Sequence, residues 1–206
     1  MLVMNILSAG PAPSETVPIF PLGTVLYPGM RLPLRIFEAR YMDMAKACLK
    51  HDAAFGICLI REGQEVGTPA VPEAVGCLAR IGDWDMATLG VLNVTAEGLE
   101  RFRLTATRTA PSGLILGDIE RIPAELPVQA PELAPSAGFV RKVVEAVGPA
   151  RFSQPYRYDD ASWVGFRLAE ILPLRRAAKQ KLLELTDPGA RLAILHRFLV
   201  ERGLLS

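Results

Sequence analysis

Few side chains in this sequence are spaced in a way that supports acid–base or nucleophilic chemistry. Two pairs of carboxylates lie close together along the chain, Asp83 with Asp85 and Asp159 with Asp160. Neither pair has a neighbouring histidine or lysine that would complete a general acid–base set. The second pair also precedes an apolar pattern of helical period, where an aspartate commonly serves as the N-cap. We therefore expect these carboxylates to have structural rather than catalytic roles.

The three cysteines and two histidines do not have the spacing of a metal site. Cys48, Cys58 and Cys77 form no CxxC pair, and His51 lies far along the chain from His196. Structural zinc sites draw on closely spaced cysteine and histidine pairs. Free cysteines are most often buried, which favours inert thiols over the alternative of a reactive thiol near His51. We expect no metal and no cofactor.

No serine lies in a G-x-S-x-G turn, so the sequence carries no nucleophile elbow. Together with the absence of an acid–base set, this predicts that the chain alone is not an enzyme. Glu38, at the start of a helical pattern, has two interpretations. It is either one half of a structural ion pair with a strand arginine, Arg80 or Arg101, or a charged anchor for a ligand. Charged groups near a core are usually paired, which favours the ion pair.

Five aromatic residues are the candidates for contact with a peptide or another ligand. Trp84 falls in a polar segment that we expect to be a turn between strands, where an exposed aromatic can anchor a partner. Burial against the end of the sheet is the equal alternative. Tyr156 and Tyr158 lie in an expected interhelical loop and could line a groove, and Tyr27 and Phe20 lie in a proline-rich block.

The prolines of that block, Pro18, Pro21, Pro28 and Pro33, most simply fix turns and end strands, because proline lacks a main-chain donor. An edge left open beside them could accept an extended peptide by strand addition. A basic cluster at 175–181 has a solvated helix face as its default interpretation and nucleic-acid contact as its alternative.

Length and composition set the class of protein that these residues belong to. The chain has 206 residues, of which half are hydrophobic and 22% are charged, with a net charge of +1. It is long enough for one domain or two small ones and can bury a sizeable core. The longest apolar runs fall well short of the ~20 residues that span a bilayer. Residues 1–10 lack the basic start of a signal peptide, so we expect a cytoplasmic protein.

The N-terminal part shows mostly strand patterns. Residues 1–16 lack periodicity and are expected to be a flexible leader. Strands are predicted at 17–20, 31–36, 54–60, 75–81, 88–95, 100–107 and 114–122, with one helix at 38–50. A turn is predicted at Glu97-Gly98. Short strands with Gly-containing connections and a single helix predict a curled, largely antiparallel sheet or barrel over 17–122.

Four prolines at 123–135 mark a linker, after which the pattern becomes helical over 136–206. Helices are predicted at 137–147, 161–172 and 175–185, and a fourth is predicted to begin at Asp187-Pro188 and end at Gly203. Residues 1–135 have an excess of acidic side chains and residues 136–206 an excess of basic ones. This asymmetry supports two differently built halves.

The chain resembles the Lon N-terminal, or Lon substrate-binding, domain family, in particular its small stand-alone members. The residues that carry the resemblance are PIFPL at 18–22, LYPG at 26–29, LPL at 32–34, FEARY at 37–41, FGI at 55–57, VGCLARI at 75–81, GLERFR at 98–103, LPL at 172–174, KQKLLE at 179–184 and RL at 191–192. The resemblance covers nearly the whole chain and implies an α+β fold: a β-rich, PUA-like pseudo-barrel with one helix, followed by a C-terminal helical bundle.

The resemblance also implies a function. In full-length Lon proteases this region helps to recognise protein substrates and to assemble the ring. This sequence has no G-x-x-x-x-G-K-[ST] phosphate loop, so neither ATPase nor peptidase activity is expected. We expect a protein- or peptide-binding module for unfolded or extended polypeptide, linked to proteolysis or quality control, with a separate protease or ATPase as a candidate partner. The alternative is a PUA-like domain that binds RNA or a small ligand, although near-neutral charge argues against nucleic acid. The oligomeric state stays open.

Overall fold

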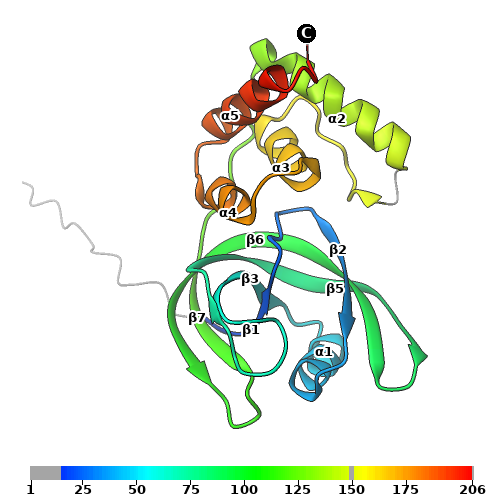
Figure 1. Cartoon of the computed structure of the whole chain (residues 1–206), viewed down its shortest axis with the longest axis vertical. Helices are drawn as coiled ribbons and strands as arrows, with labels where there is room; N and C mark the ends of the chain where they lie inside the picture. The colour runs from blue at the N-terminus through cyan, green and yellow to red at the C-terminus, as the bar shows by residue number, and fades with distance from the viewer. Residues whose placement is uncertain (1–14, 149–150, 206) are drawn as a thin grey trace, which may run out of the picture.

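A computed structural model of the chain describes residues 15–148 and 151–205. Strands fill the N-terminal half of this part and helices fill the C-terminal half, which lies above the strands in the view of Figure 1. The elements are β1 (Glu15–Leu22), β2 (Arg31–Ile36), α1 (Ala39–His51), β3 (Phe55–Glu62), β4 (Val71–Pro72), β5 (Val75–Thr88), β6 (Val91–Thr109), β7 (Ile115–Arg121), the 3-10 helix η1 (Pro131–Leu133), α2 (Ala134–Val147), α3 (Ala161–Ile171), α4 (Arg176–Glu184) and α5 (Pro188–Glu201).

The strands form a small closed barrel. Strand β1 pairs with β7 in antiparallel fashion and with β3 in parallel fashion, while β6 and β5 complete the ring between β7 and β3. Ile19 of β1, Phe102 of β6 and Ile119 of β7 fill part of its interior. Closure leaves these strands without free edges. The predicted α+β architecture, a PUA-like barrel with one helix and then a helical bundle, is confirmed.

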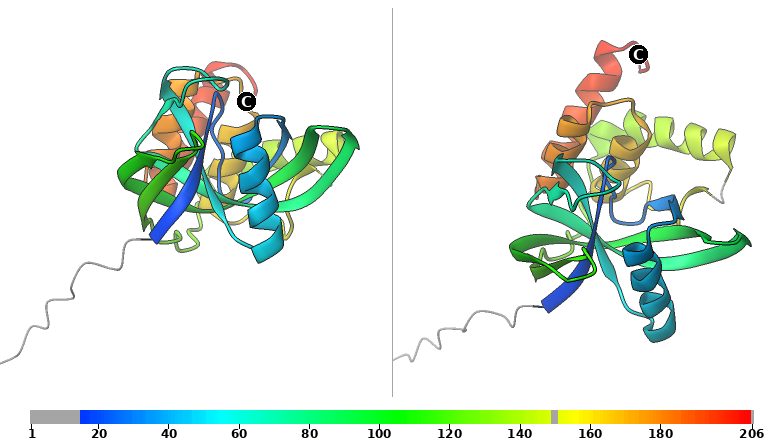
Figure 2. Two further views of the ribbon diagram at one scale, coloured as in Figure 1. Left: turned by 90° about the horizontal axis from the view of Figure 1, so that it is seen from below. Right: turned by 60° about the horizontal axis from the view of Figure 1, so that its bottom comes forward.

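A second, smaller sheet extends from this barrel. In the first part of β6, residues 92–97 pair with β2 on one side, and residues 91–95 pair with residues 83–88 of β5 on the other. We call these three segments the outer sheet. Helix α1 packs against it through a core cluster that includes Tyr41 and Val94. Both views in Figure 2 show the tip of the green β5–β6 hairpin extending beyond α1.

Helices α3 and α5 begin where the sequence predicted them to begin, whereas α2 begins at Ala134, three residues before the predicted start. The Asp160 carboxylate accepts a hydrogen bond of 3.0 Å from the Ser162 N–H and caps α3. The Asp187 carboxylate does the same for α5 with the Ala190 N–H, also at 3.0 Å. An aspartate at this position satisfies a main-chain donor that the helix leaves free. The predicted helices match α2 to α5 to within a few residues.

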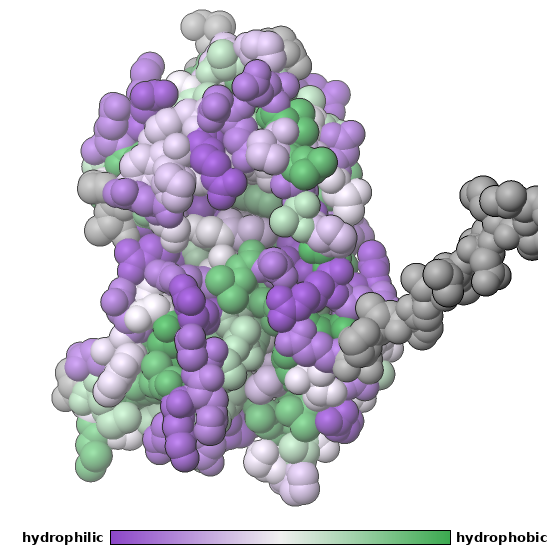
Figure 3. Space-filling model, turned by 180° about the vertical axis from the view of Figure 1, so that it is seen from behind, coloured by the Kyte–Doolittle hydropathy of each residue, from purple (hydrophilic) through white to green (hydrophobic). Residues whose placement is uncertain are grey.

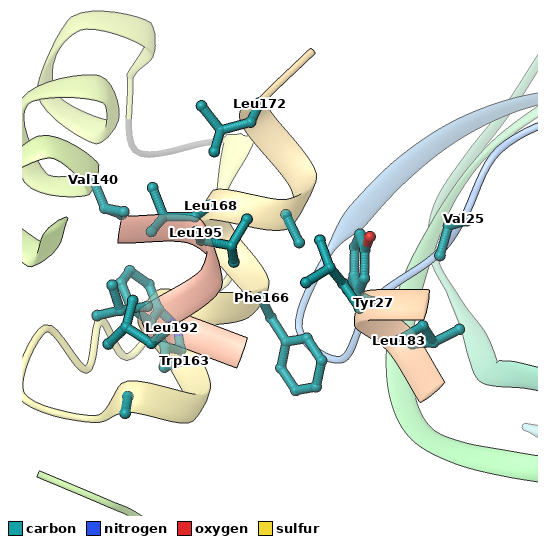
Figure 4. Packing of buried hydrophobic residues seen from close by; sticks show 14 of the residues in the cluster. Val25, Tyr27, Val140, Trp163, Phe166, Leu168, Leu172, Leu183, Leu192 and Leu195 are labelled. Atoms are coloured by element: carbon teal, nitrogen blue, oxygen red, sulfur yellow. The ribbon is translucent and has the colours of Figure 1, made fainter. Parts of the chain in front are cut away.

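The two halves share one hydrophobic cluster. Val25, Tyr27 and Val75 of the β-rich half pack with residues of α3, α4 and α5. Figure 4 shows Tyr27 beside Phe166 and Leu183, on the side of the cluster that faces the strands. The proline-rich segment predicted as a linker at 123–135 therefore connects two halves that are in direct contact.

The structure corrects the predicted turn at Glu97-Gly98. Strand β6 runs through both residues without interruption, and the hairpin turn lies at Leu89-Gly90, where Gly90 has a φ of 80°. Gly98 is needed for a different reason. A Cβ at this position would lie 2.1 Å from the carbonyl oxygen of Tyr27, so only glycine permits the crossing chain to approach.

Two further boundaries differ from the sequence-based prediction. Residues 1–14 of the expected leader lie outside the described residues, but Glu15 and Thr16 belong to β1 and pair with Ile119 and Asp118 of β7. The two-residue strand β4 was not predicted, because Val71-Pro72 is too short for an alternating pattern.

Candidate functional site

Three rows of residues run across β2, β6 and β5 of the outer sheet, with one residue from each strand in register in each row. In the middle row Leu34 of β2, Val94 of β6 and Trp84 of β5 lie side by side. Val94 is buried, whereas Trp84 is 59% exposed. Trp84 was predicted to lie in a turn. It lies instead within β5, because the hairpin continues to Thr88, but its exposure agrees with the anchor interpretation.

Further exposed apolar side chains surround the tip of the same hairpin. Met86 of β5 is 40% exposed and Leu89 in the turn is 97% exposed. Phe37 is 55% exposed and directly follows Ile36, whose partner in β6 is Leu92. We call Phe37, Trp84, Met86 and Leu89 the apolar tip. Single exposed apolar residues are common, but three on the β5–β6 hairpin with a fourth at the end of the neighbouring β2 indicate an interaction surface.

Three of these four residues were not predicted as binding residues. Phe37 was noted only as part of a family motif. Met86 and Leu89 were not considered, because a turn was predicted around Trp84 and a strand at 88–95, whereas the hairpin turn lies at Leu89-Gly90. An apolar residue beside a turn glycine was the available signal.

Figure 3 shows the reverse face of the molecule, where green patches lie among hydrophilic side chains over the β-rich half.

Charged side chains flank the apolar surface. Asp83 and Asp85 lie on either side of Trp84, and a hollow of about 380 Å³ is lined by these residues together with Arg35 and Val94. Asp83 accepts a hydrogen bond of 2.6 Å from Arg31 of β2. This ion pair crosses the outer sheet, so it supports the sheet rather than a reaction.

The predicted ion pair between Glu38 and a strand arginine is wrong in its partner. The Glu38 carboxylate lies 2.9 Å from Nη2 of Arg40, two residues along the chain. Arg80 lies 3.8 Å from Glu97, and Arg101 pairs with Glu125. The start of α1 turns Glu38 toward its own first turn, so a local partner replaces the distant one. Arg40 also donates to the Gly113 carbonyl at 3.1 Å, which gives this pair a structural role.

A buried ionic cluster joins the two halves. Arg101 of β6 donates to Glu125 at 2.7 Å and to the carbonyls of Leu183 and Leu185 at 2.8 Å. Glu125 also accepts hydrogen bonds from Arg191 of α5, and from the Ser162 hydroxyl at 2.5 Å. The side chains of both arginines and of Glu125 are almost completely buried.

Electrostatics of this cluster hold Glu125 in its charged form. Burial alone would raise its pKa, but hydrogen bonds from Arg191 and Ser162, with the charges of Arg191 and Arg101, outweigh it, so that the pKa of Glu125 is lowered. Burial lowers the pKa of Arg101, opposed by the charge of Glu125. The bonds are made within the protein, so we assign the cluster a structural role.

Two of the candidate aromatics are not surface residues. Tyr27 is fully buried, and its hydroxyl donates to the Lys179 carbonyl at 2.8 Å. Burial raises its pKa above the usual range. Phe20 is buried and stacks on Tyr41 with 4.1 Å between ring centroids. The proline-rich block therefore supplies core aromatics, and Tyr27 in particular fastens the barrel to α4.

Tyr156 and Tyr158 lie in the loop before α3 and are half-buried. Both pack against Trp163, with ring centroids at 6.1 Å and 5.1 Å, and the Arg141 guanidinium lies 4.3 Å from the centre of the Tyr158 ring. Burial raises the pKa of Tyr158. The loop is thus packed onto the helical half, and the structure does not bring these tyrosines to the outer sheet.

One pair that resembles catalytic machinery emerged only from the structure. The Ser136 hydroxyl of α2 lies 2.9 Å from Nδ1 of His196 in α5. Ser136 is fully buried, so no substrate can reach its oxygen. The three cysteines are buried thiols, and burial raises the pKa of each. Within residues 15–148 and 151–205, no group of three His, Cys, Asp or Glu side chains could hold a metal ion.

The basic cluster at 175–181 does not form a single positive face. Lys179 donates to the Glu170 carbonyl at 2.9 Å, and Lys181 pairs with Glu184 at 2.7 Å. Among the described helices, none is long and apolar enough to cross a bilayer.

Comparison with known proteins agrees with this architecture. The family model of the ATP-dependent protease La (LON) substrate-binding domain matches residues 16–201. The crystal structure of a Lon N-terminal domain protein from Xanthomonas campestris superimposes with a TM-score of 0.74 at 35% identity, covering 88% of this chain and 96% of that one. The N-terminal domain of the Mycobacterium avium complex Lon protease, at 20% identity, shares the fold with a TM-score of 0.62 and the same coverage of both chains.

Curated relatives include the Lon proteases of Erwinia amylovora and Escherichia coli K12, each 25% identical over 189 residues. These matches cover 87% of this chain but only 24% of each protease, so the chain spans about a quarter of the length of these relatives. The family model covers nearly the whole chain and the structural neighbours have the same barrel and bundle. The chain belongs to the Lon substrate-binding domain family.

Proposed function

We propose that this protein is a non-catalytic recognition module for unfolded or extended polypeptide. The observation that carries the proposal is the apolar tip of the outer sheet, an exposed cluster in a family described as substrate-binding. The module acts in the cytoplasm, in proteolysis or protein quality control. A separate ATPase or protease would take over what it binds.

The apolar tip fits the chemistry of an unfolded chain. Unfolded polypeptides expose aliphatic and aromatic side chains that a folded protein buries. Burial of one such side chain contributes about 1.5–3 kcal/mol. Ordering a flexible segment costs about 1–2 kcal/mol per residue, so the net affinity is modest. A weak, sequence-tolerant contact suits a protein that samples many substrates and releases them.

The alternative of an RNA-binding PUA-like domain lacks an observation in its favour. Within the basic cluster, Lys179 and Lys181 are engaged by Glu170 and Glu184. Asp83 and Asp85 flank the apolar hollow, and their negative charges would repel a phosphate backbone.

Binding to a permanently unfolded polypeptide tests the proposal. We expect fluorescently labelled, reduced and carboxymethylated α-lactalbumin to bind the wild-type protein, and Trp84→Ala or Leu89→Ser to weaken binding about tenfold, the effect of losing one buried apolar contact. Leu126→Ser is the matched control, because Leu126 is 81% exposed but lies in the segment between the halves. Equal binding by wild type, Leu89→Ser and Leu126→Ser would exclude the apolar tip as the site.

A further inference from the structure

Strand β2 has an open edge. It pairs with β6 and with no other described strand, and residues 83–88 of β5, which also pair only with β6, form the opposite edge of the outer sheet. Pro33 and Arg35 are exposed along β2. An edge of this kind offers unpaired main-chain groups to an additional strand.

A single hydrogen bond shows which main-chain groups of β2 face that edge. The Gly98 N–H donates to the Met30 carbonyl at 2.9 Å, and these residues continue the register in which Arg31 lies opposite Glu97. In an antiparallel pair, hydrogen-bonded and non-hydrogen-bonded pairs alternate. The residues at 32, 34 and 36 therefore bond to β6, and those at 31, 33 and 35 direct their main-chain groups outward.

The position of Pro33 agrees with this assignment. Proline has no main-chain N–H, and at an outward-facing position no hydrogen bond between β2 and β6 is lost. The outer edge offers the Pro33 carbonyl and both main-chain groups of Arg35. An added strand would thus find an acceptor alone at Pro33 and both a donor and an acceptor at Arg35.

A hollow of about 300 Å³ runs along the same edge. All six residues from Leu32 to Phe37 line it in sequence, which requires the hollow to lie beside the strand rather than on one face. Phe20 of β1 and Val66 of the β3–β4 loop line it from across the gap. The space is therefore walled by apolar side chains and bounded on one side by an open strand edge.

The hydrophobic core is incomplete at this edge. Leu32 and Leu34 pack against the α1 cluster but are only half-buried. Their partners one strand inward, Ala96 and Val94, are buried. A strand placed beside β2 would cover the two leucines with its own inward-facing side chains.

The charged side chains around the hollow are of both signs. Glu38 is paired with Arg40, and the Glu65 carboxylate accepts the Gly23 N–H at 2.5 Å. Arg35, which is exposed, has no ion-pair partner among the described residues. The hollow that holds Trp84 also includes Pro33, Leu34 and Arg35, so the two hollows meet on β2.

We propose that the polypeptide recognised by this module binds as an added strand along β2, with aliphatic side chains in the hollow. This inference rests on the proposed function and names its binding mode. Main-chain pairing explains how one surface can accept many sequences, because every polypeptide has the same main chain.

Removal of one outward donor tests the binding mode. Arg35→Pro deletes the N–H that faces the visiting strand, and Arg35→Ala, the matched control, deletes only the side chain. We expect Arg35→Pro to bind carboxymethylated α-lactalbumin up to about tenfold more weakly than Arg35→Ala, the effect of one lost hydrogen bond. Circular dichroism and a melting curve check that Arg35→Pro is folded. Equal binding by the two folded variants would overturn the inference.

A second measurement needs no protein variant. Overlapping short peptides of the same α-lactalbumin locate the segment that binds best, and two N-methylated versions block alternate N–H groups. An added strand uses every second donor, so we expect one version to lose binding and the other to keep it. If both bind like the parent, strand addition is excluded although polypeptide recognition stands. If wild type binds no carboxymethylated chain, the proposed function itself fails.

Discussion

Arg101 of β6 and Glu125 of the connecting segment form a buried ion pair, with 2.7 Å between Nη2 and Oε1. Arg191 of α5 binds the same carboxylate from the helical half. One side chain in the segment between the halves thus holds an arginine from each. The cluster therefore joins the barrel to the helical half, because these buried charges are paired with one another rather than with water.

Replacement of Glu125 is expected to be severely destabilising. Glu125→Gln keeps the size of the side chain but leaves Arg101 and Arg191 buried without a counter-charge, which costs about 3–5 kcal/mol. Urea unfolding followed by circular dichroism measures the loss. Glu100→Gln is the control, because Glu100 pairs with Arg121 at an exposed site and should cost less than about 1 kcal/mol. Equal losses in the two variants would contradict the structural role of the cluster.

The lowered pKa of Glu125 predicts part of the loss of stability at acidic pH. The folded-state pKa of Glu125 is lowered from the usual 4.5, so its contribution to stability is complete above about pH 4.5 and is lost as the pH falls through the folded value. Melting temperatures of wild type and Glu125→Gln should therefore converge as the solution is acidified. Glu170 has the opposite shift, since burial raises its pKa, but it is present in both proteins and cancels in the difference. A constant gap between the two melting curves at all pH values would argue against this assignment.

Local sequence signals predicted much of the fold. The caps at Asp160 and Asp187 depend only on a side chain and its own next turn, so they were predicted correctly. Glu38 shows the limit of such reasoning. Its burial near the barrel implied a partner, but the choice of Arg40 over a strand arginine depends on how the start of α1 directs the side chain.

The candidate site was less predictable than the fold. A glycine after Glu97 resembles a turn in sequence, whereas Gly98 serves the close crossing of the chain at Tyr27, a contact between residues far apart in sequence. That error divided β6, and the separate prediction of a turn around Trp84 with a strand at 88–95 hid Leu89. Trp84 was chosen for its residue type, and only the register with Val94 and Leu34 places it on a shared surface.

Gly98 is expected to tolerate no side chain. An alanine Cβ would lie 2.1 Å from the Tyr27 carbonyl oxygen, and the main chain on both sides is held by hydrogen bonds to Gly29 and Met30. We expect Gly98→Ala to cost about 3 kcal/mol, the upper end of overpacking effects. Gly138→Ala is the control, since a Cβ there meets nothing within 4 Å and helix propensity should stabilise α2 by about 1 kcal/mol. A wild-type melting temperature for Gly98→Ala would show that the crossing can relax.

Tyr158 separates packing from binding. Its ring packs edge-on against Trp163 and under Arg141, so Tyr158→Ala should lower stability by about 1–3 kcal/mol through lost apolar burial. Because the loop lies on the helical half, affinity for carboxymethylated α-lactalbumin should stay at the wild-type value. Weaker binding by a Tyr158→Ala variant that is still fully folded would show that this loop forms part of the binding site, as expected from the sequence.

The Ser136–His196 pair gives the sharpest test of the non-enzymatic assignment. A serine hydroxyl 2.9 Å from a histidine ring nitrogen resembles an activated nucleophile, but this oxygen is buried where α2 meets α5. Its role is then to join the two helices, and Ser136→Ala should lower the free energy of unfolding by about 1 kcal/mol, the typical worth of one hydrogen bond. A fluorophosphonate probe, which labels activated serines, should leave the wild-type protein unmodified. Labelling of wild type that disappears in Ser136→Ala would show that the Ser136 hydroxyl is accessible to solvent and activated. That result would indicate hydrolase activity. Stability loss without labelling would confirm that the pair has a structural role.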